Sequence, residues 1–275
     1  MGRMQLDLPI CSTCGVQYAK PRPDCPICID ERQYVGWDGQ QWTTLAGLQA
    51  AGHEGQLADE GPGVVGIGAD PPTAIGQRAL LARAPGGNVL WDMITYIDDN
   101  LIARVRELGG VSAIAISHPH FYGSMIEWAH AFGAPVYIHR KDREWVARPD
   151  DAVVFWDGDT REIGDGLTLI NAGVHFDGGQ VLHWAGPPDG AGALFSGDIF
   201  TVVQDRRWVS FMYSYPNLIP ERPGAIRRAL ALIEPFRFDR VYGGWWRRVV
   251  AADGAAAVQR SAERYLRFAL DGNEL

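Results

Sequence analysis

The sequence predicts an α/β domain preceded by a short segment that folds around a metal ion. Short runs rich in Val, Ile and Leu alternate with helical patterns along most of the 275 residues. Three of the predicted strands run into histidine or aspartate, which are metal-ligating side chains. All four cysteines lie between Cys11 and Cys28, so none remains for a disulfide framework elsewhere.

The cysteines form two Cys-x-x-Cys knuckles, Cys11 with Cys14 and Cys25 with Cys28, with ten residues between them. Four thiolates from paired knuckles make a closed tetrahedral site, so we expect a structural zinc ion, with iron as the alternative occupant. A redox pair would need to lie near a βαβ pattern, and disulfides would need an oxidising compartment. The knuckles resemble those of zinc ribbons and rubredoxins. We therefore expect a zinc ribbon over residues 1–40 that depends on its metal to fold.

Residues 41–62 are predicted to connect this segment to the main domain. A short helix begins at Thr43 or Thr44, whose hydroxyl is suited to cap it, and the Gly- and acid-rich residues 52–63 have the composition of a linker. Three apolar pieces then follow, separated by turn residues, at 64–68, 79–83 and 88–92. They predict an antiparallel meander.

A helix over about residues 98–108 leads into the central stretch 111–117, which ends in His118-Pro119-His120. Residues i and i+2 of an extended chain project to the same side, so both imidazoles can reach one point beyond the strand. In open α/β sheets, ligands collect at this carboxyl edge. The predicted strands 167–173 and 193–197 run into His175 and Asp198. Three imidazoles and a carboxylate suit Zn²⁺ or, less selectively, Fe²⁺ or Mn²⁺.

These motifs resemble the metallo-β-lactamase superfamily. Its pattern is His-x-His-x-Asp-His after one strand, Gly-His-x-x-Gly after a later strand, an Asp closing a Ser-Gly-Asp turn, and a final His. The resemblance covers residues 63–275 and implies an αββα sandwich. It implies that His118, His120 and His175 hold the first metal and that Asp198 is the bridging carboxylate, and these four are the candidate catalytic residues.

The second metal site of the family pattern has lost its other ligands. Its Asp and His become Tyr122 and Gly123, and Trp245 and Trp246 stand where the final His is expected. We therefore expect one metal ion at this centre. Aromatic residues are expected to line the substrate pocket, namely Tyr122, Tyr213, Tyr215 and Trp245. Core packing or a subunit contact is the alternative for the aromatic segment 211–220, and a homodimer is the assembly considered.

Charge and hydropathy restrict the partners. The net charge is −8, and residues 1–60 carry four Lys and Arg against eight Asp and Glu, which disfavours nucleic-acid binding. No apolar run has the length of a membrane span and no signal-peptide core precedes Cys11, so we expect a cytoplasmic protein without a membrane partner.

The resemblance implies a metal-dependent hydrolase acting on a small molecule. Its mononuclear zinc would supply hydroxide to an ester, thioester or lactone. The alternative is a non-catalytic metal- or ligand-binding protein that has kept the fold. A zinc-ribbon nucleic-acid binder is a third hypothesis, which the charge disfavours.

Overall fold

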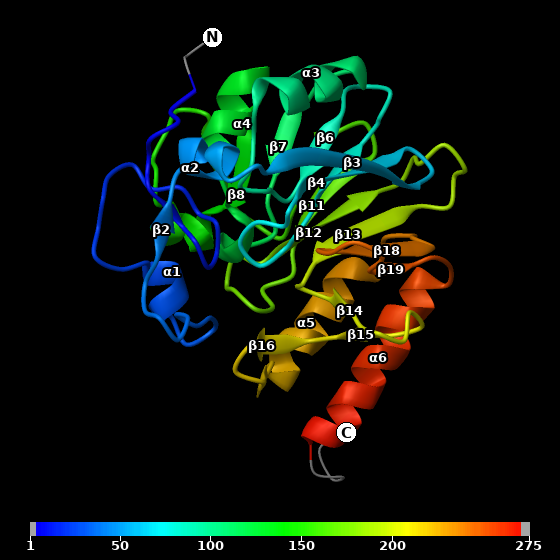
Figure 1. Ribbon diagram of the computed structural model, residues 1–275. Coiled ribbons are helices and arrows are strands. Elements are labelled where there is room, and N and C mark those ends of the chain that lie inside the picture. Colours follow the sequence, from blue (N-terminus) through cyan, green and yellow to red (C-terminus); the bar gives the residue numbers. More distant parts are fainter. Residues whose placement is uncertain (1–3, 271–275) are drawn as a thin grey trace.

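Two β-sheets lie face to face at the centre of the molecule, and helices cover the outer face of each sheet (Figure 1). The computed structural model describes residues 4–270. The seven-stranded sheet has its strands in sequential order: β3 (Glu54–Gly61), β4 (Val64–Asp70), β5 (Ala79–Ala82), β6 (Val89–Trp91), β7 (Ala113–Ala115), β8 (Val136–His139) and β9 (Val153–Trp156). The six-stranded sheet contains, in order, β10 (Thr160–Gly164), β11 (Leu167–Asn171), β12 (Gln180–Trp184), β13 (Ala193–Gly197), β18 (Arg240–Gly243) and β19 (Val249–Val250).

Strand directions bring the candidate ligands to common edges. Strands β3 to β6 pair antiparallel, which confirms the predicted meander, and β6 to β9 pair parallel. In the second sheet, β12 pairs antiparallel with both β11 and β13, so β11 and β13 run in the same direction. His175 and Asp198 therefore follow strands that end at the same edge. Two short ribbons follow β13: β14 (Thr201–Val202) with β15 (Val209–Ser210), and β16 (Met212–Ser214) with β17 (Ile219–Pro220).

The helices complete the sandwich. The first sheet is covered by α3 (Asp99–Glu107) and α4 (Met125–Phe132), and the second by α5 (Pro223–Ile233) and α6 (Gly254–Ala269). A third apolar cluster lies between the sheets and includes Trp91, Leu169 and Phe195. Helix α3 begins as predicted, since the Asp98 side chain accepts a hydrogen bond from the amide of Leu101. The expected αββα sandwich is confirmed.

The N-terminal residues 4–43, which we call the four-cysteine segment, pack against this sandwich. They contain β1 (Ile10–Cys11), α1 (Pro26–Ile29) and β2 (Trp42–Thr43), and β1 pairs with β2. Their four cysteines belong to the same buried cluster as α3 and α4. Helix α2 (Leu45–Ala50) follows and is capped by Thr44, as predicted.

Two expectations from the sequence are wrong. Residues 54–61 are not a linker, because they form strand β3 at the edge of the seven-stranded sheet. The central stretch is also not extended through both histidines. Strand β7 ends at Ala115, His118 is extended, and His120 lies in a 3₁₀ turn over Pro119–Phe121. The second imidazole is therefore placed by a turn and not by strand alternation.

Candidate metal centre

Three histidines from two separate loops meet in the interior. His118 and His120 follow β7, and His175 follows β11. One ring nitrogen of each lies within 4.8 Å of the other two. The ring centroids form a nearly equal triangle, with separations of 4.9, 4.7 and 5.1 Å. Each residue is at most 3% exposed. This group is able to hold one metal ion.

Hydrogen bonds to backbone carbonyls fix which nitrogen His175 presents to its neighbours. His175 Nδ1 lies 2.8 Å from the carbonyl oxygen of Tyr213 and 3.1 Å from that of Met212. A carbonyl oxygen can only accept, so Nδ1 carries the proton and Nε2 keeps its lone pair. That Nε2 atom lies 3.2 Å from His120 Nδ1. Two nitrogens bound to one tetrahedral Zn²⁺ would be about 3.3 Å apart, so this pair fits a shared ion.

His118 is held from its other side by a hydroxyl, which can donate or accept and therefore orients the ring without fixing its tautomer. Ser117 Oγ lies 2.9 Å from His118 Nδ1, which leaves Nε2 for a ligand. Burial is the main factor that lowers the pKa of His118 and of His120 well below the usual value, and it lowers the pKa of His175 to about 4. All three imidazoles are therefore neutral at pH 7, which is the form that binds metals.

Two buried carboxyl groups adjoin the histidines. Asp198 Oδ1 lies 3.2 Å from His118 Nε2, but Asp198 is outside the group of ligand atoms that are mutually within 4.8 Å. Asp92 accepts a hydrogen bond of 2.7 Å from the amide of Ser117. Burial, followed by the nearby Asp92 carboxylate, raises the pKa of Asp198 to about 8, and burial raises that of Asp92 to about 7. A cation beside them would favour their ionised forms.

Several buried polar atoms of the histidines and the two aspartates have no hydrogen bond in the described part of the chain. Within residues 4–270, four buried atoms around the cluster make no hydrogen bond, namely His118 Nε2, His120 Nε2, Asp198 Oδ1 and Asp92 Oδ2; the close approach of His118 Nε2 to Asp198 Oδ1 lacks hydrogen-bond geometry. Buried polar atoms are normally paired, and a cluster of unpaired ones is explained by an ion or water between them. The donor set therefore fits a divalent metal.

Comparison with known proteins gives one relative close in sequence. The chain is 48% identical over 262 residues to the "Uncharacterized protein YmaE" of Bacillus subtilis (strain 168), and the match covers 94% of this chain and 95% of that protein. The chain belongs to the YmaE family. No family model matches it.

Solved structures that resemble this YmaE-family chain are metallo-β-lactamases. They include VMB-1, with a TM-score of 0.57, 13% identity and coverage of 79% of this chain and 99% of that chain. They also include FIM-1 from Pseudomonas aeruginosa in its mono-zinc form, with a TM-score of 0.56, 13% identity and coverage of 79% and 97%. A third is the metallo-β-lactamase from Hirschia baltica, with a TM-score of 0.53, 16% identity and coverage of 77% and 97%. The fold is the metallo-β-lactamase fold. None of the helices in the described part of the chain has the length and apolar character of a membrane span.

At two sequence positions where the metallo-β-lactamase pattern has further ligands, this YmaE-family chain has Gly123 and Trp245. A Cβ atom at Gly123 would lie 2.7 Å from the carbonyl oxygen of Ile94, so no side chain fits there. Phe121 packs 4.8 Å from the His118 ring, and Trp245 packs 5.6 Å from Phe121. Neither position therefore offers a ligand side chain.

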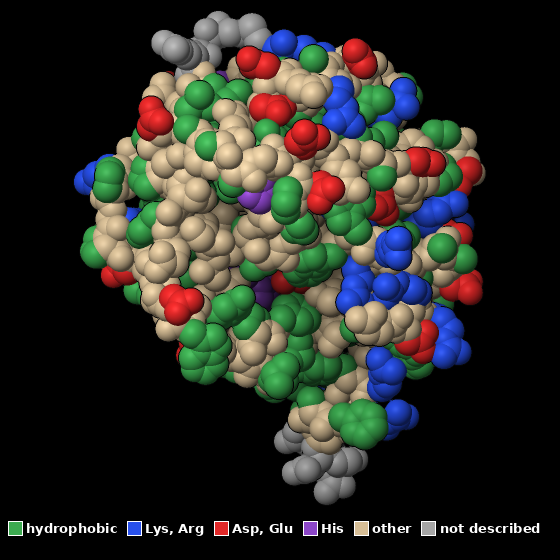
Figure 2. Space-filling model, viewed as in Figure 1, with side chains coloured by type: hydrophobic (Ala, Val, Ile, Leu, Met, Phe, Trp, Pro, Cys, Tyr) green, Lys and Arg blue, Asp and Glu red, His purple; other side chains and the backbone are tan. Residues whose placement is uncertain are grey.

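Two of the four expected pocket residues lie on a groove beside the centre. Tyr215 and Trp245 line a groove of about 950 Å³, together with Leu218, Trp246 and Arg248. Tyr215 also reaches the centre, since its ring lies 5.7 Å from that of His175 and its hydroxyl donates to the carbonyl oxygen of Asp198 at 2.8 Å. Figure 2 shows apolar side chains gathered on the lower part of one face, with Lys and Arg beside them.

The other two expected pocket residues are placed elsewhere. Tyr122 is 1% exposed and lies in the core, with its hydroxyl 3.4 Å from the carbonyl oxygen of Asp142. Tyr213 points toward the four-cysteine segment, where its hydroxyl donates to Glu31 at 2.7 Å. Neither tyrosine lines the groove, because the Tyr122 and Tyr213 hydroxyls contact Asp142 and Glu31 instead.

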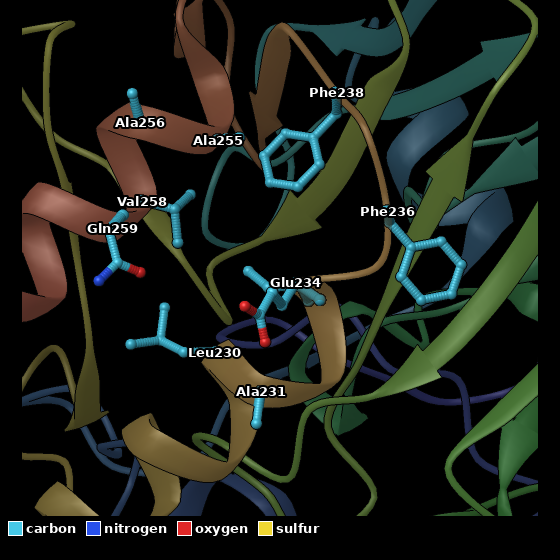
Figure 3. Close-up of a pocket in the computed structure, with 10 residues that line it drawn as sticks. Leu230, Ala231, Glu234, Phe236, Phe238, Ala255, Ala256, Val258 and Gln259 are labelled. Carbon is cyan, nitrogen blue, oxygen red and sulfur yellow. The ribbon is translucent and has the colours of Figure 1, made fainter.

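A separate hollow of about 520 Å³ lies between α5 and α6 (Figure 3). It is lined mainly by apolar side chains, including Leu230, Phe238 and Val258, with Glu234 and Gln259 as polar members. It shares no residue with the histidine centre or its groove. No cluster of metal-ligating side chains within residues 4–270 lies in it.

The four cysteines form a second group able to bind metal. All four are buried and free, with Cys11 Sγ 3.6 Å from Cys28 Sγ and Cys14 Sγ 3.7 Å from Cys25 Sγ. Sulfur atoms bound to one tetrahedral zinc at about 2.3 Å lie about 3.8 Å apart, whereas a disulfide needs about 2.05 Å. The arrangement is that of a closed metal site.

Sequence reasoning missed several residues around the histidine centre. Phe176 packs against all three imidazoles, with centroid distances of 5.4, 5.0 and 5.1 Å. Glu221 accepts a 2.7 Å hydrogen bond from the amide of His175, whose φ is +68°. Arg32 stacks on Phe176 from the four-cysteine segment. Only Phe176 adjoins a motif residue in sequence, so no local signal indicated the other two.

Proposed function

We propose that this protein is a metal-dependent hydrolase that uses one metal ion to cleave an ester, thioester or lactone. The observation that carries the proposal is the convergence of three neutral imidazoles, two of them oriented by hydrogen bonds, in a metallo-β-lactamase fold. FIM-1, which has the same fold, has been solved in a mono-zinc form, so the fold accommodates a single ion at its centre. Zn²⁺ is the favoured occupant, with Fe²⁺ or Mn²⁺ as alternatives for a nitrogen-rich site.

Each residue has a role that follows from its contacts. His118, His120 and His175 would hold the ion, and Ser117 and the Tyr213 carbonyl orient two of the rings. When bound, such an ion lowers the pKa of a water ligand to about 7 and polarises a carbonyl group. Phe176 covers the imidazoles and excludes bulk water from them.

Asp198 is assigned as the proton acceptor rather than a fourth ligand. Its Oδ1 atom contacts His118 but is outside the mutual reach of the three nitrogens, so it stands beside the ion's position. The family's water-orienting Asp is replaced by Tyr122, whose hydroxyl faces Asp142. Of the two carboxyl groups beside the cluster, Asp198 is the one that lies 3.2 Å from a ring nitrogen of His118. The neighbouring groove, with Tyr215, Trp245 and Arg248, would bind a substrate that has a flat apolar part.

Metal content per chain tests the proposal. Elemental analysis of the wild type is expected to give about two metal ions, one at each site, and His118→Ala combined with His120→Ala is expected to give about one. His130→Ala is the matched control, because His130 pairs with Asp150 away from the cluster. One ion in the wild type, or no loss in the double variant, would contradict the assignment.

A non-catalytic metal-binding protein is the second candidate, and one observation favours it. The three histidines are at most 3% exposed, so a substrate must displace part of the wall to reach them. A panel of thioesters, lactones and β-lactams separates the candidates. Turnover that disappears in the double variant supports the enzyme. Two metal ions without turnover support the binding protein.

A further inference from the structure

The loop after the second cysteine knuckle is joined directly to the segment that supports His175. Tyr213 donates to the Glu31 carboxylate at 2.7 Å, and Ser214 Oγ donates to the carbonyl oxygen of Arg32 at 3.1 Å. Asn217 Nδ2 donates to the carbonyl oxygens of Glu31 and Gln33 at 2.8 and 3.0 Å. These contacts join parts of the chain more than 180 residues apart, and the loop begins close after Cys28.

The same segment sets the orientation of one candidate ligand. The Tyr213 carbonyl that accepts from His175 Nδ1 belongs to the residue whose side chain is bonded to Glu31. Displacing this segment would remove the hydrogen bond that fixes both the orientation of the His175 ring and the nitrogen that carries its proton. Groups that orient a metal-ligating histidine in this way typically change metal affinity 10–100-fold when they are removed.

Arg32 adds a second contact between the knuckle and the centre. Its guanidinium carbon lies 4.0 Å from the centroid of Phe176 and 5.3 Å from that of Tyr213. Asp30 holds the guanidinium in a two-pronged ion pair, with distances of 2.6 and 2.9 Å. The Arg32 side chain is only 13% exposed. Since Phe176 packs on all three histidines, Arg32 fixes the ring that closes the centre.

Residues that follow the first knuckle contact the loop that carries His120. The amide of Gln17 donates to the carbonyl oxygen of Gly123 at 3.0 Å, and Thr95 Oγ1 donates to that of Gly15 at the same distance. Gly123 follows His120 by three residues. The cysteine cluster, which ties the two knuckles to each other, therefore spans the loops of His120 and His175.

We propose that metal at the four cysteines positions the histidine centre, with Arg32 and Asn217 as positioning residues. A segment of this size needs its metal to stay folded, so losing that metal would loosen both loops. The histidine centre would then bind its own metal more weakly. The coupling itself is structural, and only its effect on metal affinity rests on the metal binding at the histidines that the proposed function requires.

Affinity of the histidine centre for Co²⁺ tests this coupling, because imidazole- and thiolate-bound Co²⁺ have different visible spectra. Asn217→Ala, which keeps all four cysteines, is expected to weaken Co²⁺ binding at the histidines about tenfold or more. Asn88→Ala is the matched control, since Asn88 Nδ2 also donates to two carbonyls, those of Leu108 and Gly110, far from the cysteines in sequence. Equal histidine-site affinity in the two variants would overturn the proposal.

Hydrogen exchange gives a readout that does not depend on the histidine metal. Cys28→Ser is expected to speed exchange in residues 172–178 and 209–218 relative to the strands of the two sheets. If the wild type binds no metal at the histidines, the proposed function fails and this measurement still decides the coupling. Unchanged exchange in both peptides would overturn it. If Cys28→Ser does not fold, Asn217→Ala provides the same comparison.

Discussion

Alanine at Gly123 should destabilise the protein more than alanine at another left-handed glycine. Gly123 has φ of +47°, and a Cβ there would meet the carbonyl oxygen of Ile94 at 2.7 Å. Gly133 ends α4 with φ of +67°, and nothing lies within 4 Å of its Cβ position. The two positions share the cost of placing an L-residue in the left-handed region, about 1–2 kcal/mol. Only Gly123 adds overpacking against rigid backbone, which costs about 1–3 kcal/mol.

The expected loss in unfolding free energy is therefore about 1–2 kcal/mol for Gly133→Ala and about 2–5 kcal/mol for Gly123→Ala. Denaturant titration with zinc present measures both. The same clash predicts the outcome of restoring the family motif with Tyr122→Asp and Gly123→His. Metal content should stay at about two ions per chain, because the new imidazole cannot be placed without moving Ile94. A third ion, with stability no lower than that of Gly133→Ala, would refute the argument that position 123 is closed.

Three further predictions concern buried charges. Burial raises the pKa of Asp142 to about 7, so the folded state loses stability as pH rises from about 4 to 7. Asp142→Asn removes this pH dependence. In denaturant titrations, the unfolding free energy of the wild type should fall by about 3 kcal/mol more than that of the variant between pH 5 and pH 8. Equal pH profiles would contradict this. Arg78→Met leaves the carboxylate of Glu60, whose side chain is 9% exposed, without its buried partner, and should cost about 3 kcal/mol of unfolding free energy, whereas a loss below 1 kcal/mol would show the pair to be dispensable. Glu221→Ala removes the group that accepts the hydrogen bond of the His175 amide, and it should weaken Co²⁺ binding at the histidines about tenfold. Glu221→Gln keeps an acceptor oxygen and should keep most of the affinity. Equal effects of the two substitutions would refute this role.

The histidine cluster could be predicted because its members end strands. His118 and His175 each follow an apolar run, and strand direction alone brings such residues to one edge. The position of His120 was predicted for the wrong reason. Pro119 starts a 3₁₀ turn, so turn geometry brings the second ring to the cluster.

Strand β3 was missed because its stability does not come from apolar side chains. Its sequence from Glu54 to Gly61 is polar, and its residues are exposed or partly exposed. Its register with β4 is fixed by backbone pairing along the edge of the sheet, and polar side chains are normal at such an edge. Composition therefore indicated a linker where tertiary pairing makes a strand. Arg32 was missed for a related reason, since its partner Phe176 is far away in sequence.

The closed second metal position and the four-cysteine segment meet at one residue. In the metallo-β-lactamase pattern, position 123 carries a ligand side chain, whereas here its carbonyl oxygen accepts the amide of Gln17. Gln17 is itself 3% exposed, and Arg148 joins its side chain to Glu127. A histidine at 123 would have to displace Ile94, and that movement would also disturb the contact with the first knuckle. The docking of the four-cysteine segment and the presence of a second metal are thus competing uses of the same loop.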